Sequence, residues 1–147
     1  MPAVRLETQF SVFLVNKPGV LAQVTRALAE SKINIMAMTL VDSQEHGVLR
    51  LVAQDQAATR KTLTALNLPM TETDVICLEL SNNPGALADV ATLLGKNHIN
   101  INYAYCTSGA PGGKTTGIFK VADHGKATKL LEVVVERKQE TAVRPRR

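Results

Sequence analysis

Two short polar turns recur in the sequence and carry residue types suited to hold a small charged ligand. They are Asn16-Lys17-Pro18-Gly19 and Asn82-Asn83-Pro84-Gly85, and each is followed by an apolar run of helical spacing. An asparagine side chain offers both a hydrogen-bond donor and an acceptor. The first N–H groups of a helix have no partner inside the helix and favour an anion. Such a turn therefore suits a molecule with an ammonium and a carboxylate, as an α-amino acid has.

A second shared segment begins the strand expected after each helix, as Ile33-Asn34-Ile35 and Ile99-Asn100-Ile101. Its asparagines offer the same chemistry as the turns. A purely structural role is equally open, in which the turn glycines permit a tight bend and the two strand asparagines cap helix C-termini or satisfy turn backbone. The candidate ligand-binding residues are Asn16, Pro18, Gly19, Val20, Leu21, Asn34 and Ile35 in the first copy, and Asn82, Pro84, Gly85, Ala86, Leu87, Asn100 and Ile101 in the second.

The turns belong to an internal repeat whose two copies are offset by 66 positions. Ten of the twenty residues from Asn16 to Ile35 are identical at that offset. Two copies are too few for a solenoid, so the repeat predicts two globular modules. We expect module boundaries of 1–73 and 74–147, with a basic tail at 137–147.

Hydrophobic periodicity predicts the order βαββαβ in each copy. In the first copy we expect strands at Arg5–Val15, Ile33–Val41, Val48–Ala53 and Pro69–Thr73, helices at Pro18–Ser31 and Asp55–Leu66, and a polar loop at Asp42–Gly47. In the second we expect strands at Asp74–Leu80, Ile99–Thr107 and Thr116–Val121, and helices at Pro84–Asn97 and Asp123–Val135. The segment Glu136–Glu140 is too polar for a central strand, so the closing strand is displaced, replaced by a longer helix, or absent.

The βαββαβ order predicts the ferredoxin-like α+β fold, in which two helices cover one face of an antiparallel sheet of order 4-1-3-2. The second strand of each module then lies at an open edge, which a protein must cover. We expect the modules to pair side by side, with Ile33–Val41 near Ile99–Thr107 within one chain or across a homodimer.

The remaining polar residues lack the spacing of a catalytic or metal site. His46, His98 and His124 are scattered, and the carboxylates show no paired arrangement. The segment Ser108–Thr115 is one residue short of a phosphate-binding loop. Such a loop needs a helix directly after it, whereas Thr116–Val121 is predicted as a strand. We therefore expect neither an enzyme nor a cofactor nor a metal.

Charge and apolar content argue against two further classes of partner. The formal net charge is +4, but Arg144, Arg146 and Arg147 crowd the last residues, which favours a frayed tail over a nucleic-acid surface. No segment approaches the roughly 18 to 20 apolar residues that a membrane span needs. Cys77 and Cys106 lie in apolar strand-like runs, which favours buried free thiols over a disulfide. We expect a cytoplasmic protein.

At the level of motifs, the sequence resembles the ACT domain family. The resemblance rests on the Asn-x-Pro-Gly-x-Leu-Ala-x-Val turn and helix followed by Ile-Asn-Ile, present twice and covering the chain to about Val135. It is greatest to small stand-alone tandem ACT proteins. The resemblance implies regulatory binding of an amino acid between two modules, with Asn16 matched to Asn100 and Asn82 to Asn34.

The sequence departs from serine-sensing members of that family. Those members carry a histidine two residues before the turn asparagine, where this chain has Leu14 and Leu80. An apolar amino acid is therefore at least as plausible a ligand as serine. The alternative function is an interaction module or regulatory subunit that docks on an amino-acid biosynthetic enzyme without binding ligand itself.

Overall fold

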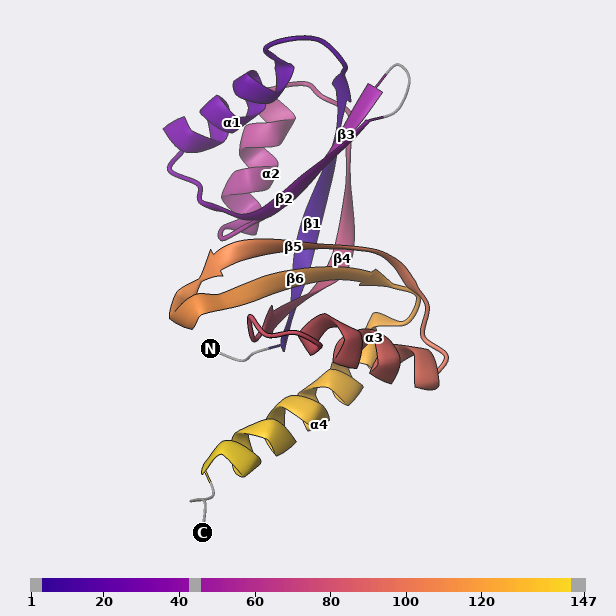
Figure 1. Ribbon diagram of the computed structural model, residues 1–147. Helices are drawn as coiled ribbons and strands as arrows, with labels where there is room; N and C mark the ends of the chain where they lie inside the picture. Colours follow the sequence, from indigo (N-terminus) through magenta and orange to yellow (C-terminus); the bar gives the residue numbers. More distant parts are fainter. Residues whose placement is uncertain (1–3, 43–45, 144–147) are drawn as a thin grey trace. The chain divides into compact units, whose positions relative to one another are not determined.

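The computed structural model describes residues 4–42 and 46–143, which form two compact α+β modules (Figure 1). The first module is Thr8–Thr73, and the second combines residues 4–7 with residues 74–143. The chain passes from the first module to the second after residue 73. Residues 4–7, which the sequence places in the first module, instead group with the second. The α+β class and the two βαββαβ modules are confirmed.

The first module contains its four strands in the order β2-β3-β1-β4, the arrangement expected for the fold. Its elements are β1 (Val4–Val15), α1 (Val20–Glu30), β2 (Ile35–Asp42), β3 (His46–Ala53), α2 (Gln56–Ala65) and the start of β4 (Met70–Leu80). The helix α1 buries Val20, Val24 and Leu28, whose spacing of four puts them on one face. That face packs on alternate β1 residues such as Phe10 and Val12, so the core lies between the helices and the sheet.

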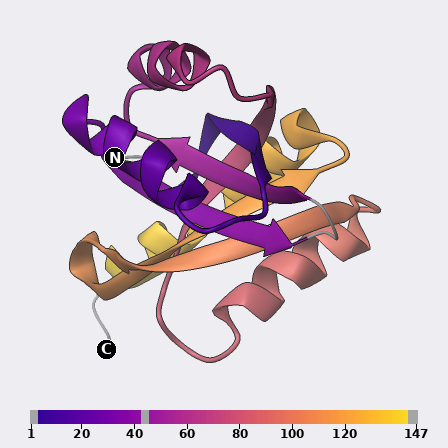
Figure 2. The same ribbon diagram turned by 90° about the horizontal axis from the view of Figure 1, so that it is seen from above.

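The second module repeats this plan with α3 (Ala86–Lys96), β5 (Ile101–Ala110), β6 (Lys114–Val121) and α4 (His124–Val143). Its strands follow the order β1-β4-β6-β5, and β5, drawn in orange in Figure 2, is the last of them. A separate core joins Ile76 and Leu78 of β4 to Leu94 of α3 and Phe119 of β6. The strands expected at Pro69–Thr73 and Asp74–Leu80 are one continuous strand, because no glycine or proline interrupts β4.

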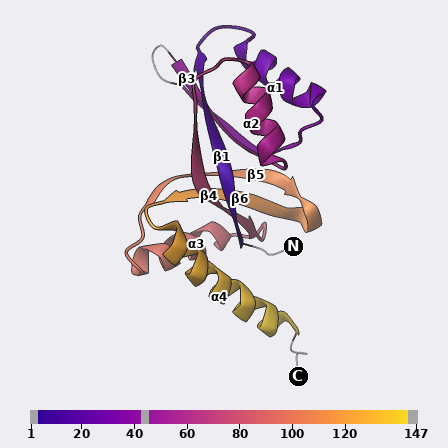
Figure 3. The ribbon, with the colours of Figure 1, turned by 180° about the vertical axis from the view of Figure 1, so that it is seen from behind.

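The closing strand of the second module comes from the start of the chain. β1 is the neighbour of β4 in the hydrogen-bonded order, and its residue Val4 is buried in the same core as Ile76. The polar segment Glu136–Glu140 continues α4, which runs as one helix to Val143 (Figure 3). Of the alternatives left open by the sequence, the longer helix is therefore correct, and residues 4–7 provide the fourth strand.

The edge strands and cysteines differ in part from expectation. Within its own module, β2 pairs with β3 and β5 pairs with β6, so each edge strand is hydrogen-bonded on one side. Edge-to-edge pairing stays a prediction. Both cysteines are free, as expected. Cys77 is buried, and burial raises the pKa of its thiol to about 11. Cys106 is exposed because it lies on the edge strand, so the expectation that it is buried was wrong.

The closing role of the N-terminal segment makes a testable prediction about stability. Val4 is 5% exposed and Leu6 is 47% exposed. Val4→Ala should lower the free energy of unfolding by about 1 to 3 kcal/mol, because it removes buried apolar area and leaves a cavity. Leu6→Ala is the matched control and should cost less. Denaturant unfolding measures both, and equal small losses would show that residues 4–7 do not complete the core.

Candidate functional site

The two Asn-x-Pro-Gly turns have the same backbone geometry. Gly19 precedes α1 with φ 89° and Gly85 precedes α3 with φ 90°, both in the left-handed region that favours glycine. Neither cap residue supplies a side-chain hydrogen bond to its helix. The helix therefore begins at Val20, not at Pro18 as the sequence suggested, because a left-handed residue cannot belong to a right-handed helix. Its first N–H groups lack intrahelical acceptors.

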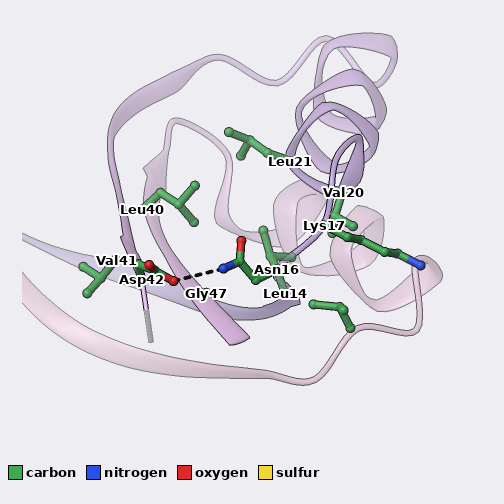
Figure 4. A pocket seen from close by; sticks show the side chains of 10 residues that line it. Leu14, Asn16, Lys17, Val20, Leu21, Leu40, Val41, Asp42 and Gly47 are labelled. Carbon is green, nitrogen blue, oxygen red and sulfur yellow. Dashed lines mark hydrogen bonds between the residues drawn. The ribbon is translucent and has the colours of Figure 1, made fainter. Parts of the chain in front are cut away.

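A cavity of about 180 Å³ lies beside the first turn. All of its lining residues belong to the first module, and they come from the β1 end, the start of α1, the end of β2 and the start of β3 (Figure 4). They are Leu14, Val15, Asn16, Lys17, Val20, Leu21, Leu40, Val41, Asp42 and Gly47. The cavity combines an apolar wall with a polar corner at Asn16 and Asp42.

A hydrogen bond fixes the polar corner. Asn16 Nδ2 donates to Asp42 Oδ1 over 3.1 Å (Figure 4). The bond uses the amide N–H, so the amide oxygen of Asn16 and the second carboxylate oxygen of Asp42 are both left as acceptors. The side chain of Lys17 extends away from this pair in Figure 4, so its ammonium does not neutralise the corner. Two oxygen acceptors on one side of the cavity suit an ammonium group.

Strand register explains the position of Asp42. Gly47 of β3 is paired with Leu14 of β1 on one side and with Asp42 of β2 on the other. Paired residues in adjacent strands point to the same face, so Asp42 shares the face of Leu14, which is buried in the core beneath the helices. Gly47 has no side chain between them, and the cavity occupies that space. The expected loop Asp42–Gly47 is therefore shorter, because both of its end residues belong to strands.

The structure brings together part of the predicted site. Asn16, Val20 and Leu21 line the cavity, whereas Asn34 and Ile35 lie at the far end of α1, where β2 begins. The sequence reasoning missed Leu40, Asp42 and Gly47. Pro18 and Gly19 shape the turn but do not line the cavity. The parallel direction of β1 and β2 in the predicted strand order was the signal that the end of β2 lies beside the first turn.

The strand asparagines do not cap the helices. The helix C-caps are Ser31 and Asn97, and the residues with positive φ are Lys32 and His98. The carbonyl of Asn34 accepts from the N–H of Gln54 over 3.2 Å, and that of Asn100 accepts from Ala122 over 3.1 Å. These bonds use the backbone, so a ligand role for the two exposed side chains stays a prediction.

The remaining candidates lie at and around the second turn, in the second module. Asn82, Pro84, Gly85 and Leu87 are exposed, and Ala86 is half-buried. The N–H of Ala86 donates to the carbonyl of Asn83 over 3.3 Å. Asn100 and the half-buried Ile101 lie where β5 begins.

Two further features of the described residues limit the chemistry. The strand β6 follows the glycine-rich segment directly, so this segment does not have the helix that a phosphate-binding loop requires. Among residues 4–42 and 46–143, no three His, Cys, Asp or Glu side chains are grouped to hold a metal ion. No helix in the same part of the chain has the length and apolar content to cross a membrane.

Comparison with known proteins establishes the family. The model of the ACT domain pair matches residues 6–143. The chain belongs to the ACT domain family. A crystal structure of a protein from Bacteroides thetaiotaomicron is similar to this ACT domain pair with a TM-score of 0.81 and 29% identity, over 92% of this chain and 91% of that chain.

Two further crystal structures share the fold. The regulatory subunit of aspartate kinase from Thermus thermophilus, in its ligand-free form, has a TM-score of 0.62 and 14% identity over 86% of this chain and 93% of that chain. The corresponding subunit from Thermus flavus has a TM-score of 0.57 and 16% identity over 92% of this chain and 95% of that chain. No match was found among curated proteins.

The left-handed turn glycines give a prediction about stability that is independent of ligand. A Cβ atom added at Gly19, Gly85 or Gly95 would meet nothing within 4 Å, so substitution there tests backbone conformation without a clash. Gly19→Ala and Gly85→Ala should each lower the free energy of unfolding by roughly 1 to 3 kcal/mol. Gly95→Ala, inside α3, should raise it by about 0.5 to 1 kcal/mol. Thermal or denaturant unfolding of the three variants checks the contrast; equal effects would contradict it.

Proposed function

We propose that this ACT domain pair is a regulatory protein that binds a free amino acid at an Asn-x-Pro-Gly turn. The observation that carries the proposal is the cavity at the first turn, where the bonded pair Asn16 and Asp42 lies beside the N-terminus of α1. The two acceptor oxygens of that pair suit the ammonium of an amino acid. The first N–H groups of the helix suit its carboxylate.

The same proposal extends to the assembly around the site. The second Asn-x-Pro-Gly turn has the same backbone conformation and is a second candidate for amino-acid binding. We propose that the exposed Asn34 and Asn100 contribute to ligand sites from a neighbouring module, as the family resemblance implies. A homodimer would provide such neighbours. It would also cover the sides of the edge strands β2 and β5 that are not hydrogen-bonded to β3 and β6. Binding and regulation need no cofactor and no chemistry by this chain itself, which we expect to act in the cytoplasm.

A second candidate is a regulatory subunit that docks on an amino-acid biosynthetic enzyme without binding ligand itself. It is favoured by the fold shared with regulatory subunits of aspartate kinase. The two functions differ in what the isolated protein does. Stereospecific binding of an amino acid by the purified chain supports the first. Its absence, together with co-purification of an amino-acid biosynthetic enzyme, supports the second.

Calorimetry and thermal shift across the twenty L-amino acids test the proposal. We expect at least one to bind with micromolar to millimolar affinity, about 4 to 8 kcal/mol. At 100 times its Kd, that ligand should stabilise the fold by about 2.7 kcal/mol. D-enantiomers at the same concentrations are the control. The proposal fails if every amino acid gives neither heat nor a thermal shift.

Asn16→Ala tests the turn itself. Loss of one hydrogen bond to a charged ligand should cost roughly 1.5 to 3 kcal/mol of affinity, which is a tenfold to hundredfold rise in Kd. The stability of the unliganded protein should change little, because Asn16 is exposed. Asn102→Ala, an exposed asparagine on β5, is the control. A variant that loses stability but keeps full affinity would make Asn16 a structural turn residue.

A further inference from the structure

The two turns share their backbone geometry but differ in the side chains around them. Resting on the proposed function, we propose that the turn of the first module is the one that binds ligand. We further propose that its ligand is an amino acid with a small aliphatic side chain, whose ammonium group is held by Asp42 and Asn16. The inference rests on three differences between the turns, which concern space, charge and the apolar wall.

The first difference is the space above the sheet. Leu14 of β1 is paired with Gly47, whereas its counterpart Leu80 of β4 is paired with Thr115. The cavity lies over Gly47, where no side chain fills the gap between Leu14 and Asp42. At the corresponding position of the second module a β-branched side chain stands in that gap. The first turn therefore has a cavity beside it, and in the second a threonine side chain takes the place that Gly47 leaves free.

The second difference is the distribution of charge. Asp42 is replaced in the second repeat by Ser108, which has no charge to hold an ammonium group. The first helical turn of α1 carries no acidic residue. The first helical turn of α3 carries Asp89, at the position where α1 has Gln23. A negative side chain at a helix N-terminus repels a second carboxylate. The Asn-x-Pro-Gly turn of the first module thus combines a carboxylate for the ammonium with a helix N-terminus free of acidic side chains for the carboxylate, and the turn of the second module has neither feature.

The third difference is the apolar wall, which sets the side chain of the ligand. Leu40 is 47% exposed and lines the cavity, whereas the side chain of Val41 points away from it in Figure 4, because the two residues face opposite sides of β2. Leu21 completes the wall from α1 (Figure 4). Bound aliphatic carbon would cover this exposed apolar surface, which is favourable. The β5 residue that corresponds to Leu40 is Cys106, a smaller side chain, so the wall has less apolar surface in the second module.

Placing the second module's threonine in the first module tests whether the ligand occupies the space over Gly47. Gly47→Thr should raise the Kd for the preferred amino acid at least a hundredfold. The variant should still fold, because Gly47 has no left-handed φ and its added Cβ would lie 3.4 Å from Leu40 Cδ1, the end of a flexible side chain. Val48→Thr places a threonine one position along β3, on the other face, and should keep binding. Retained affinity in Gly47→Thr overturns the assignment of the cavity.

The charge argument is tested by pairing a variant with a ligand analogue. Asp42→Asn should weaken L-leucine binding about tenfold to a hundredfold while changing the Kd for 4-methylpentanoate, which lacks the ammonium, less than threefold. A merely structural role of Asp42 would weaken both equally. Ser108→Ala is the control at the corresponding position and should leave both affinities unchanged. Equal losses for the two ligands would overturn the assignment of Asp42.

Selectivity and stoichiometry complete the test, all by calorimetry on the full chain. We expect leucine, isoleucine or valine to bind at least tenfold more tightly than serine or aspartate, with one ligand per chain. Two ligands per chain, or a preference for a polar amino acid, would overturn this inference while leaving the proposed function intact. Absence of binding by every amino acid would overturn both.

Discussion

The strand β3 lies between β1 and β2 and is hydrogen-bonded to both, and the candidate site depends on this arrangement. Because β3 is antiparallel to each, β1 and β2 run in the same direction, and their C-terminal ends lie at the same end of the sheet. Asp42 therefore reaches Asn16 although 26 residues separate them in sequence. The helix α1 begins at that same end, because it follows β1 in the chain after a short turn. One pattern of strand pairing thus collects an amide, a carboxylate and a helix N-terminus around one cavity.

The turn glycine makes the helix N-terminus accessible. With φ 89°, Gly19 turns the chain sharply after β1, so α1 starts without a side-chain cap. A serine or aspartate cap would satisfy one of the first N–H groups of the helix and so compete with an anionic ligand. The same geometry recurs at Gly85, which shows that the backbone alone does not define a site. What distinguishes the first turn is the missing side chain at Gly47 and the carboxylate of Asp42.

Much of the fold could be predicted from the sequence because the repeat and the apolar periodicity agree. The strands and helices of both modules were placed within a few residues, since a set such as Val20, Leu21, Val24 and Leu28 shares one face of a helix but not of a strand. The closing strand of the second module could not be found this way. Val4 joins that module through contacts with residues far along the chain, which local patterns do not encode. The continuation of α4 through a polar segment was left open for the same reason.

The candidate site was predicted in part. Asn16 and the start of α1 were found because their residue types recur in the repeat. Asp42 and Gly47 were assigned to a polar loop, because aspartate and glycine are common in turns and their pairing across β2 and β3 is a property of strand register. The identical residues of the two copies mark the features that the turns share, namely the asparagine, the proline and the glycine. The residues that differ between the copies are those that shape the cavity.

The most direct measurement is an NMR titration of the uniformly labelled protein with an aliphatic amino acid. Binding at the first turn predicts that the backbone amide signals of Gly19, Val20 and Leu21 shift in proportion to occupancy. The signals of the corresponding Gly85, Ala86 and Leu87 should stay in place. Shifts confined to the second turn, or spread over both turns equally, would contradict the account.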